Sequence, residues 1–197
     1  MNRSAVSAEL ARYARAHPED AAVLARFARL LDDTPAPFAR DQYQPGHLTC
    51  SACVLDDAGK HVLLLHHARL DRWLQPGGHA EPGDATPLAG ALRELREESG
   101  LADPAPLAGA DGGALVDLDV HEISARGAEP AHLHYDLRYA FTINGASALR
   151  ASAESHALRW VEIARLAELT DEESVTRLVA RALSRARARA DVHGSGR

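Results

Sequence analysis

The stretch GGHAEPGDATPLAGALRELREESG, from Gly77 to Gly100, constrains the fold of this chain more than any other segment. It predicts a loop rich in glycine followed by a helix. Thr86 is a good N-cap, Pro87 suits the first helical position, and Gly100 suits the C-terminal cap. We therefore expect a helix from Pro87 to about Ser99, after a loop whose glycines let the backbone approach a ligand closely.

Three carboxylates share one face of that helix. Glu94, Glu97 and Glu98 follow the spacing i, i+3, i+4, and Arg93 lies four residues before Glu97, where it can steady that side chain. Such a cluster is either a solvated acidic face or a site for a hard divalent cation such as Mg²⁺, which prefers oxygen ligands. The adjoining glycines favour the metal site, and the Gly77 carbonyl could complete its ligand set.

Composition excludes several classes of protein. The chain has 197 residues, 46% hydrophobic and 25% charged, which is ordinary for a globular protein of one domain with additions. A formal net charge of −6 argues against nucleic acid as the main partner. No apolar run approaches the roughly 18 residues of a membrane span, and the N-terminus lacks the apolar segment of a signal peptide. We therefore expect a cytoplasmic protein with no membrane partner.

Helices and strands are mixed along the chain. The first forty residues show helical periodicity, and strand-like segments begin near His47, several of them joined as hairpins. Cys50 and Cys53 lie on one such strand, where positions i and i+3 point to opposite faces, so they are expected as ordinary buried cysteines and not as a redox pair. The pattern predicts an α+β fold with a mixed or largely antiparallel sheet packed between helices.

The stretch from Gly77 onwards resembles the Nudix box, G-x5-E-x7-R-E-U-x-E-E-x-G-U with U aliphatic. The matching positions are Gly78, Arg93, Glu94, Leu95, Glu97, Glu98, Gly100 and Leu101. The chain departs from the pattern at the first acidic position, where Asp84 replaces Glu and eight residues, not seven, separate it from Arg93. We place the extra residue, Ala85, in the loop before the helix, so the register of the carboxylates is kept.

The resemblance covers residues 46–169 and is to a bacterial Nudix subgroup of unknown substrate. It implies the Nudix fold, an α/β/α sandwich with a mixed sheet between helices. Outside this domain we expect an N-terminal helical extension over 1–40, a C-terminal helix over 170–190 and a disordered tail over 191–197.

The resemblance also implies an activity: metal-dependent hydrolysis of a pyrophosphate bond in a nucleoside diphosphate linked to another moiety, by attack of water on phosphorus. Carried over by position, Glu94, Glu97, Glu98 and the Gly77 carbonyl bind Mg²⁺ or Mn²⁺, and Arg93 joins the three glutamates in the catalytic set. Two alternatives stay open. One is a regulatory module that binds nucleotide without turnover, and the other is a hydrolase of a non-nucleotide diphosphate.

A second group of polar residues lies on the strand AHLHYDLRYAF. Alternation places His132, His134, Asp136 and Arg138 on one face, which is a solvent face, a lining of the substrate cleft, or a transition-metal site that would need a third partner. His67 ends a strand and His79 lies in the glycine loop, where either could meet phosphate. The candidate substrate-binding residues are His67, His79, His134 and Arg138.

The C-terminal segment RLVARALSRARARADVHGSGR is rich in arginine. Helical spacing puts most of these arginines opposite the apolar stripe, so we interpret them as a solvated face, with binding to nucleic acid or to an acidic partner as the less favoured alternative. The terminal helices could cover one side of the sheet or form the interface of a homodimer, and the sequence does not decide between the two. The resemblance to the Nudix family implies that the partner is a small-molecule nucleoside diphosphate derivative.

Overall fold

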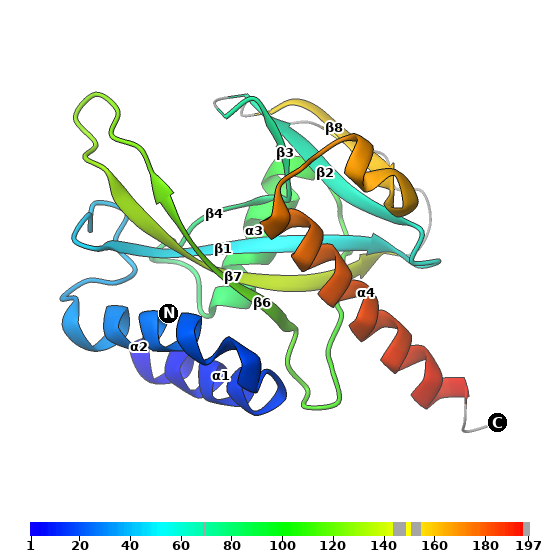
Figure 1. Ribbon diagram of the computed structural model, residues 1–197, viewed down its shortest axis with the longest axis horizontal. Helices are drawn as coiled ribbons and strands as arrows, with labels where there is room; N and C mark the ends of the chain where they lie inside the picture. The colour runs from blue at the N-terminus through cyan, green and yellow to red at the C-terminus, as the bar shows by residue number, and fades with distance from the viewer. Residues whose placement is uncertain (69, 144–148, 151–154, 195–197) are drawn as a thin grey trace.

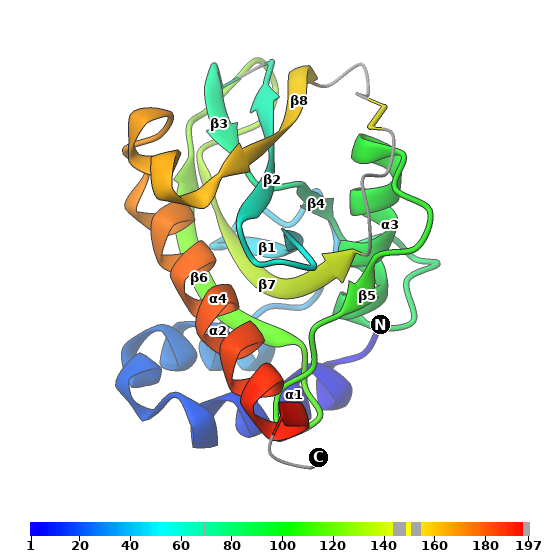
Figure 2. The ribbon, with the colours of Figure 1, turned by 90° about the vertical axis from the view of Figure 1, so that its right-hand side faces the viewer.

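The computed structural model describes residues 1–68, 70–143, 149–150 and 155–194. Within these residues an eight-stranded mixed sheet lies between helices, which confirms the predicted sandwich (Figures 1 and 2). The strands are β1 Gly46–Asp56, β2 His61–His67, β3 Arg72–Leu74, β4 Gly77–His79, β5 Ala105–Pro106, β6 Leu115–Ile123, β7 His132–Ile143 and β8 Ser155–Glu162. The helices are α1 Arg3–Ala16, α2 Ala21–Asp33, α3 Pro87–Ser99 and α4 Glu173–Gly194, with 3₁₀ turns η1 Pro18–Asp20 and η2 Ile163–Glu168.

The centre of the sheet is the parallel pair β1 and β7, which stay in register from Gly46 opposite Leu133 to Asp56 opposite Ile143. Strand β6 runs antiparallel along the outer edge of β7. On the other side of β1, the short strand β4 pairs with its first half and β2 meets its far end. Both long central strands are therefore covered on both edges, as their continuous burial requires.

The two faces of the sheet carry two separate apolar clusters. Helices α1, α2 and α3 pack on one face together with Cys50, and α4 packs on the other face together with Cys53 (Figure 1). Both cysteines are fully buried and free, so the prediction of two ordinary cysteines on opposite faces of a strand is confirmed. The terminal helices thus cover both faces of the sheet, α1 and α2 on one and α4 on the other.

Helix α3 begins and ends where the sequence predicted. The Thr86 side chain accepts a hydrogen bond from the Ala89 N–H at 3.1 Å, Pro87 is the first helical residue, and Gly100 ends the helix in the left-handed conformation with φ of 69°. Ala85 is exposed in the loop before the cap. The one-residue insertion therefore leaves the helix register unchanged.

The C-terminal end of the chain differs from the prediction. Helix α4 continues to Gly194, so residues 191–194 are helical and do not belong to a disordered tail; residues 195–197 lie outside the described part of the chain. Within the described residues, no helix combines the length and the apolar character that crossing a membrane requires.

Three arginines of α4 also differ from the predicted solvated face. Arg177 and Arg181 donate hydrogen bonds to Asp117, which is fully buried on β6, and Arg185 donates to the Gly113 carbonyl. The expectation was wrong for these three because it considered α4 alone. A buried carboxylate needs a positive partner, and α4 supplies two where it crosses β6.

Arg181 also joins α4 to the N-terminal helices. Its Nη1 and Nη2 donate to the two carboxylate oxygens of Asp20 at 2.6 and 2.9 Å, and the Tyr13 hydroxyl donates to the same carboxylate. Burial raises the pKa of Asp20, but the hydrogen bonds from Arg181 and Tyr13 outweigh it and hold that pKa below its usual range. This contribution to stability is present above the unfolded pKa and is lost as the pH falls through the folded one.

We predict that Asp20→Asn lowers the free energy of unfolding by about 1–3 kcal/mol at pH 7, because Arg181 loses its charged partner. The difference from the unsubstituted chain should shrink as the pH falls below about 4, the usual pKa of an aspartate, and should be lost once the pH falls through the lower pKa of folded Asp20. Denaturant titrations over this pH range measure both effects. Asp32→Asn, an exposed position on α2, is the control, and a difference that does not change with pH would contradict the assignment.

Candidate active site

Two glutamates of α3 contact the glycines of β4. Glu98 is buried, and its Oε2 accepts a hydrogen bond from the Gly77 N–H at 2.9 Å. The carboxylate of Glu94 lies directly against Gly78, where a Cβ atom would come within 2.5 Å of the carboxyl carbon. The glycine at position 78 is therefore required for the Glu94 carboxylate to occupy this place.

Arg93 holds the carboxylate face together. Its Nη1 donates to Glu94 Oε1 at 2.9 Å and to Glu97 Oε2 at 3.0 Å, as the i, i+4 spacing predicted for Glu97. Its Nη2 donates to the His79 carbonyl of β4 at 2.9 Å, and both Nε and Nη2 donate to Asp84. A single guanidinium thus ties α3 to β4 and to the loop between them.

The structure shows the contacts of Asp84, whose role could not be carried over from the motif. Its carboxylate is buried, receives Arg93 at 3.1 and 3.2 Å, and accepts the Glu81 N–H at 2.8 Å. Burial raises the pKa of Asp84, but the hydrogen bonds from Arg93 and the Glu81 N–H outweigh it and lower that pKa overall. Asp84 therefore anchors Arg93 from the side opposite to the glutamates.

The chemistry of the carboxylate face fits a hard divalent cation. Burial raises the pKa of Glu94, and the neighbouring charges of Glu97 and Glu81 add to this against the opposing effect of Arg93. A cation would relieve the crowding of negative charge, and carboxylate oxygens are the donors that Mg²⁺ and Mn²⁺ prefer. Glu97 is exposed, so it can reach a ligand from the solvent side.

Two of the candidate substrate-binding residues come together at β4. The His79 ring lies 5.0 Å from the His47 ring and 5.1 Å from the His134 ring, measured between centroids. His47 was missed from the sequence. Its signal was the alternation of β1, which puts His47 on the same face as Thr49 and opposite His134 in the parallel pair.

Arg138, by contrast, is buried inside the protein. Its guanidinium donates to Asp136 at 2.8 Å, to Asp119 at 3.0 Å and to Asp117 at 3.4 Å, and it is only 2% exposed. The prediction that it binds substrate is not supported, because a guanidinium surrounded by three carboxylates is already satisfied. Arg138 instead connects β7 to β6, and through the Ser174 carbonyl to α4.

His67 lies in a different part of the sheet. It ends β2, opposite Arg72 of β3, and its Nδ1 accepts a hydrogen bond from the Leu70 N–H at 3.3 Å. The structure therefore places His67 at the turn between β2 and β3, whereas His79 is part of β4 itself.

Comparisons with known proteins bear on the fold and on the family of the chain. The family model of the NUDIX domain matches residues 46–182. The dihydroneopterin triphosphate pyrophosphohydrolase of E. coli superposes with a TM-score of 0.55 at 18% identity, over 70% of this chain and 94% of that one. The MutT protein of Methanosarcina mazei Go1 superposes with a TM-score of 0.50 at 18% identity, over 71% and 94%.

At these identities the two structures establish the fold alone. Among curated proteins no sequence match is found. The family model, however, spans more than half of the chain and contains the glycine loop, the arginine and the three glutamates of α3. The chain therefore belongs to the Nudix hydrolase family.

Proposed function

We infer from the membership of this family that the chain hydrolyses a pyrophosphate bond in a small-molecule nucleotide derivative. We propose that the bond cleaved here lies in a nucleoside diphosphate linked to another moiety, and that cleavage depends on Mg²⁺ or Mn²⁺. The ligands proposed for the cation are the carboxylates of Glu94, Glu97 and Glu98 and the carbonyl of Gly77.

One observation carries the proposal. The Glu98 carboxylate is held by the Gly77 N–H, and the Glu94 carboxylate lies against Gly78, so two acidic side chains converge on the two glycines of β4. A solvated acidic face has no need of this arrangement, because burying a carboxylate costs free energy that an exposed one does not pay. A pure nucleotide-binding module would likewise have no need of three carboxylates on one face.

The proposed site needs residues that bind the cation and residues that hold those ligands in position. A bound divalent cation would neutralise the diphosphate and lower the pKa of a bound water molecule. Arg93 acts as a positioning residue, since it orients Glu94 and Glu97 and is itself fixed by Asp84. Phosphoryl transfer depends mainly on such positioning and on charge stabilisation, so a rigid carboxylate face is the part that the protein must supply.

The cytoplasmic location and the homodimer stay predictions.

The proposal is tested with the purified chain and a panel of nucleoside triphosphates, nucleotide sugars, dinucleotides and coenzymes, in the presence of Mg²⁺ or Mn²⁺. Phosphate release is measured directly and after addition of phosphatase. We expect metal-dependent cleavage of one substrate class. Saturable nucleotide binding without turnover would instead favour a regulatory module. The absence of both nucleotide binding and turnover would favour a non-nucleotide diphosphate as the substrate.

We predict that Glu98→Gln lowers kcat/KM by about 100-fold or more, because a charged cation ligand becomes a neutral amide. The fold should be kept, since the amide oxygen can still accept the Gly77 N–H. Thermal unfolding and steady-state kinetics on the same preparations separate the two effects. Glu162→Gln, at an exposed position at the end of β8, is the control, and near-normal turnover in Glu98→Gln would refute the ligand assignment.

A second prediction compares two glycines of the same loop. Gly78→Ala should push the Glu94 carboxylate aside, because the new Cβ would lie 2.5 Å from it, and kcat/KM should fall by about 100-fold. Stability should change little, since the end of a flexible side chain can move. Gly83→Ala is the matched control, because no atom lies within 4 Å of its Cβ position. Equal activity of the two variants would show that the position of Glu94 does not matter.

A further inference from the structure

Five histidines gather at one end of the sheet, on the face opposite to α3. They come from four strands: His47 of β1, His79 of β4, His121 of β6, and His132 and His134 of β7. The strand registers produce this arrangement, because His134 is opposite His47 on one side and opposite His121 on the other. The ring centroids of His134 and its four neighbours are 4.9 to 5.5 Å apart.

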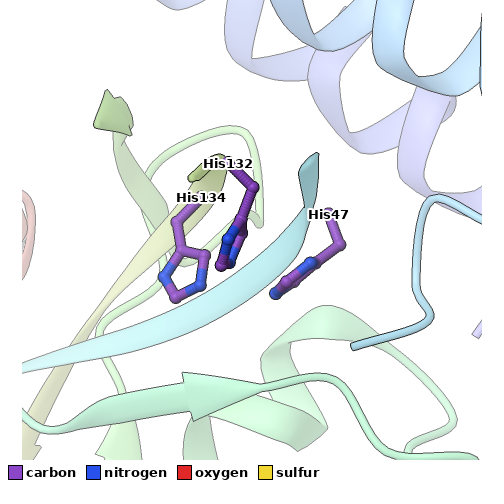
Figure 3. Close-up of side chains that lie close together, drawn as sticks. All are labelled: His47, His132 and His134. Carbon is purple, nitrogen blue, oxygen red and sulfur yellow. The ribbon is translucent and has the colours of Figure 1, made fainter. Parts of the chain in front are cut away.

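Three of these imidazoles can reach a common point. One ring nitrogen each of His47, His132 and His134 lies within 4.8 Å of the other two, and Figure 3 shows the three rings drawn together from β1 and β7. The ligand nitrogens of a tetrahedral zinc ion are about 3.4 Å apart, since each Zn–N bond is about 2.1 Å. Binding of one ion by all three rings would therefore require side-chain rotations that bring these nitrogens closer together.

The hydrogen bonds of the cluster orient the rings for this purpose. The Nδ1 of His47 lies 3.0 Å from the Gln42 carbonyl and the Nδ1 of His132 lies 2.8 Å from the Pro130 carbonyl, so each Nδ1 carries the proton and donates it. The Nε2 of each ring is then left with its lone pair. Histidines that bind metals characteristically donate their second ring N–H to a carbonyl or carboxylate in this way.

The burial of His47 is a second observation that points to a ligand, and it does not depend on the spacing of the three rings. It is 1% exposed, and within the described part of the chain its Nε2 is buried without a hydrogen-bond partner. A buried polar atom without a partner costs free energy, and a metal ion bound to this nitrogen would remove that cost. A ring nitrogen of His47 also belongs to the group of three that lie close together.

The charge state of the cluster selects the kind of ligand. Burial lowers the pKa of His47, and burial together with the neighbouring histidines lowers the pKa of His134 to about 2. At neutral pH these rings are therefore uncharged. Neutral imidazoles carry no positive charge that would attract a phosphate or another anion, but they are common ligands of zinc and related transition metals.

We propose that His47, His132 and His134 form a binding site for a transition-metal ion of the zinc class, separate from the carboxylate site on α3. Strand β4 lies between the two. Gly78 faces Glu94, and the alternation of the strand turns the next residue, His79, to the histidine side. Three protein ligands with further histidines beside them leave a fourth position for water or for another ligand.

The test measures Zn²⁺ bound per chain in a Glu98→Gln background, which weakens the carboxylate site and keeps the histidines. Competition with a chromophoric chelator should give one tightly bound Zn²⁺, unaffected by millimolar Mg²⁺. Adding His134→Asn should weaken Zn²⁺ binding by about 100-fold or more. The matched control is His61→Asn, because the His61 ring pairs with Asp56 at the other end of β1 and should leave the affinity unchanged.

A second measurement does not depend on any histidine variant folding. X-ray absorption of the zinc-loaded Glu98→Gln chain should show imidazole nitrogens at about 2.0–2.1 Å. An oxygen-only shell, or affinity that is the same with and without His134→Asn in folded protein, would overturn the proposal. So would the absence of tight Zn²⁺ binding in the Glu98→Gln chain. None of these results depends on hydrolysis, so the proposed function and the histidine site succeed or fail separately.

Discussion

The parallel pairing of β1 with β7 is the constraint on which the rest of this structure depends. The two strands begin together at Gly46 and Leu133, where a Cβ on Gly46 would lie 1.8 Å from the Leu133 carbonyl oxygen, so only glycine permits this start. From there the pair presents one apolar face to α1, α2 and α3. The opposite face changes along its length, from histidines through the Asp136–Arg138 ion pair to the apolar residues beneath α4. The carboxylate face, the histidine cluster and the buried ion pairs all lie on this pair of strands or on the elements that pack against it.

Features that depend on neighbouring residues could be predicted from the sequence. Helix α3 begins at Pro87 and ends at Ser99 because its cap, its first residue and its terminating glycine all lie within the segment. The same holds for the shared face of its glutamates and for the opposite orientations of Cys50 and Cys53, since helical and strand periodicity determine both. These predictions needed no knowledge of what packs on the element.

Features that depend on distant partners could not be predicted in the same way. Alternation placed Arg138 and His134 on one face, but it could not show that Asp117, Asp119 and Arg177 would enclose that part of the face. The arginines of α4 pointed away from its apolar stripe and were therefore interpreted as solvated, although two of them neutralise a buried carboxylate of β6. His47 lies far along the chain from His132 and His134, and the register of β1 with β7 brings the three together. In each case the missing information was the pairing of strands, which local patterns do not contain.

Strand β4 shows how a very short element can contribute to both of the proposed sites. It has three residues, and its pairing with β1 fixes Gly78 opposite Cys50 and His79 opposite Thr49. Because successive residues of a strand face opposite sides, Gly78 contacts the Glu94 carboxylate, whereas the His79 ring contacts the histidines. The two donor sets differ in kind: carboxylate oxygens suit Mg²⁺ and Mn²⁺, and buried neutral imidazoles suit zinc. Ligand chemistry, more than distance, would therefore keep each ion on its own side of β4. Arg93 strengthens this division, since it binds the His79 carbonyl and the glutamates at once and so holds the strand between the two sites in a fixed position.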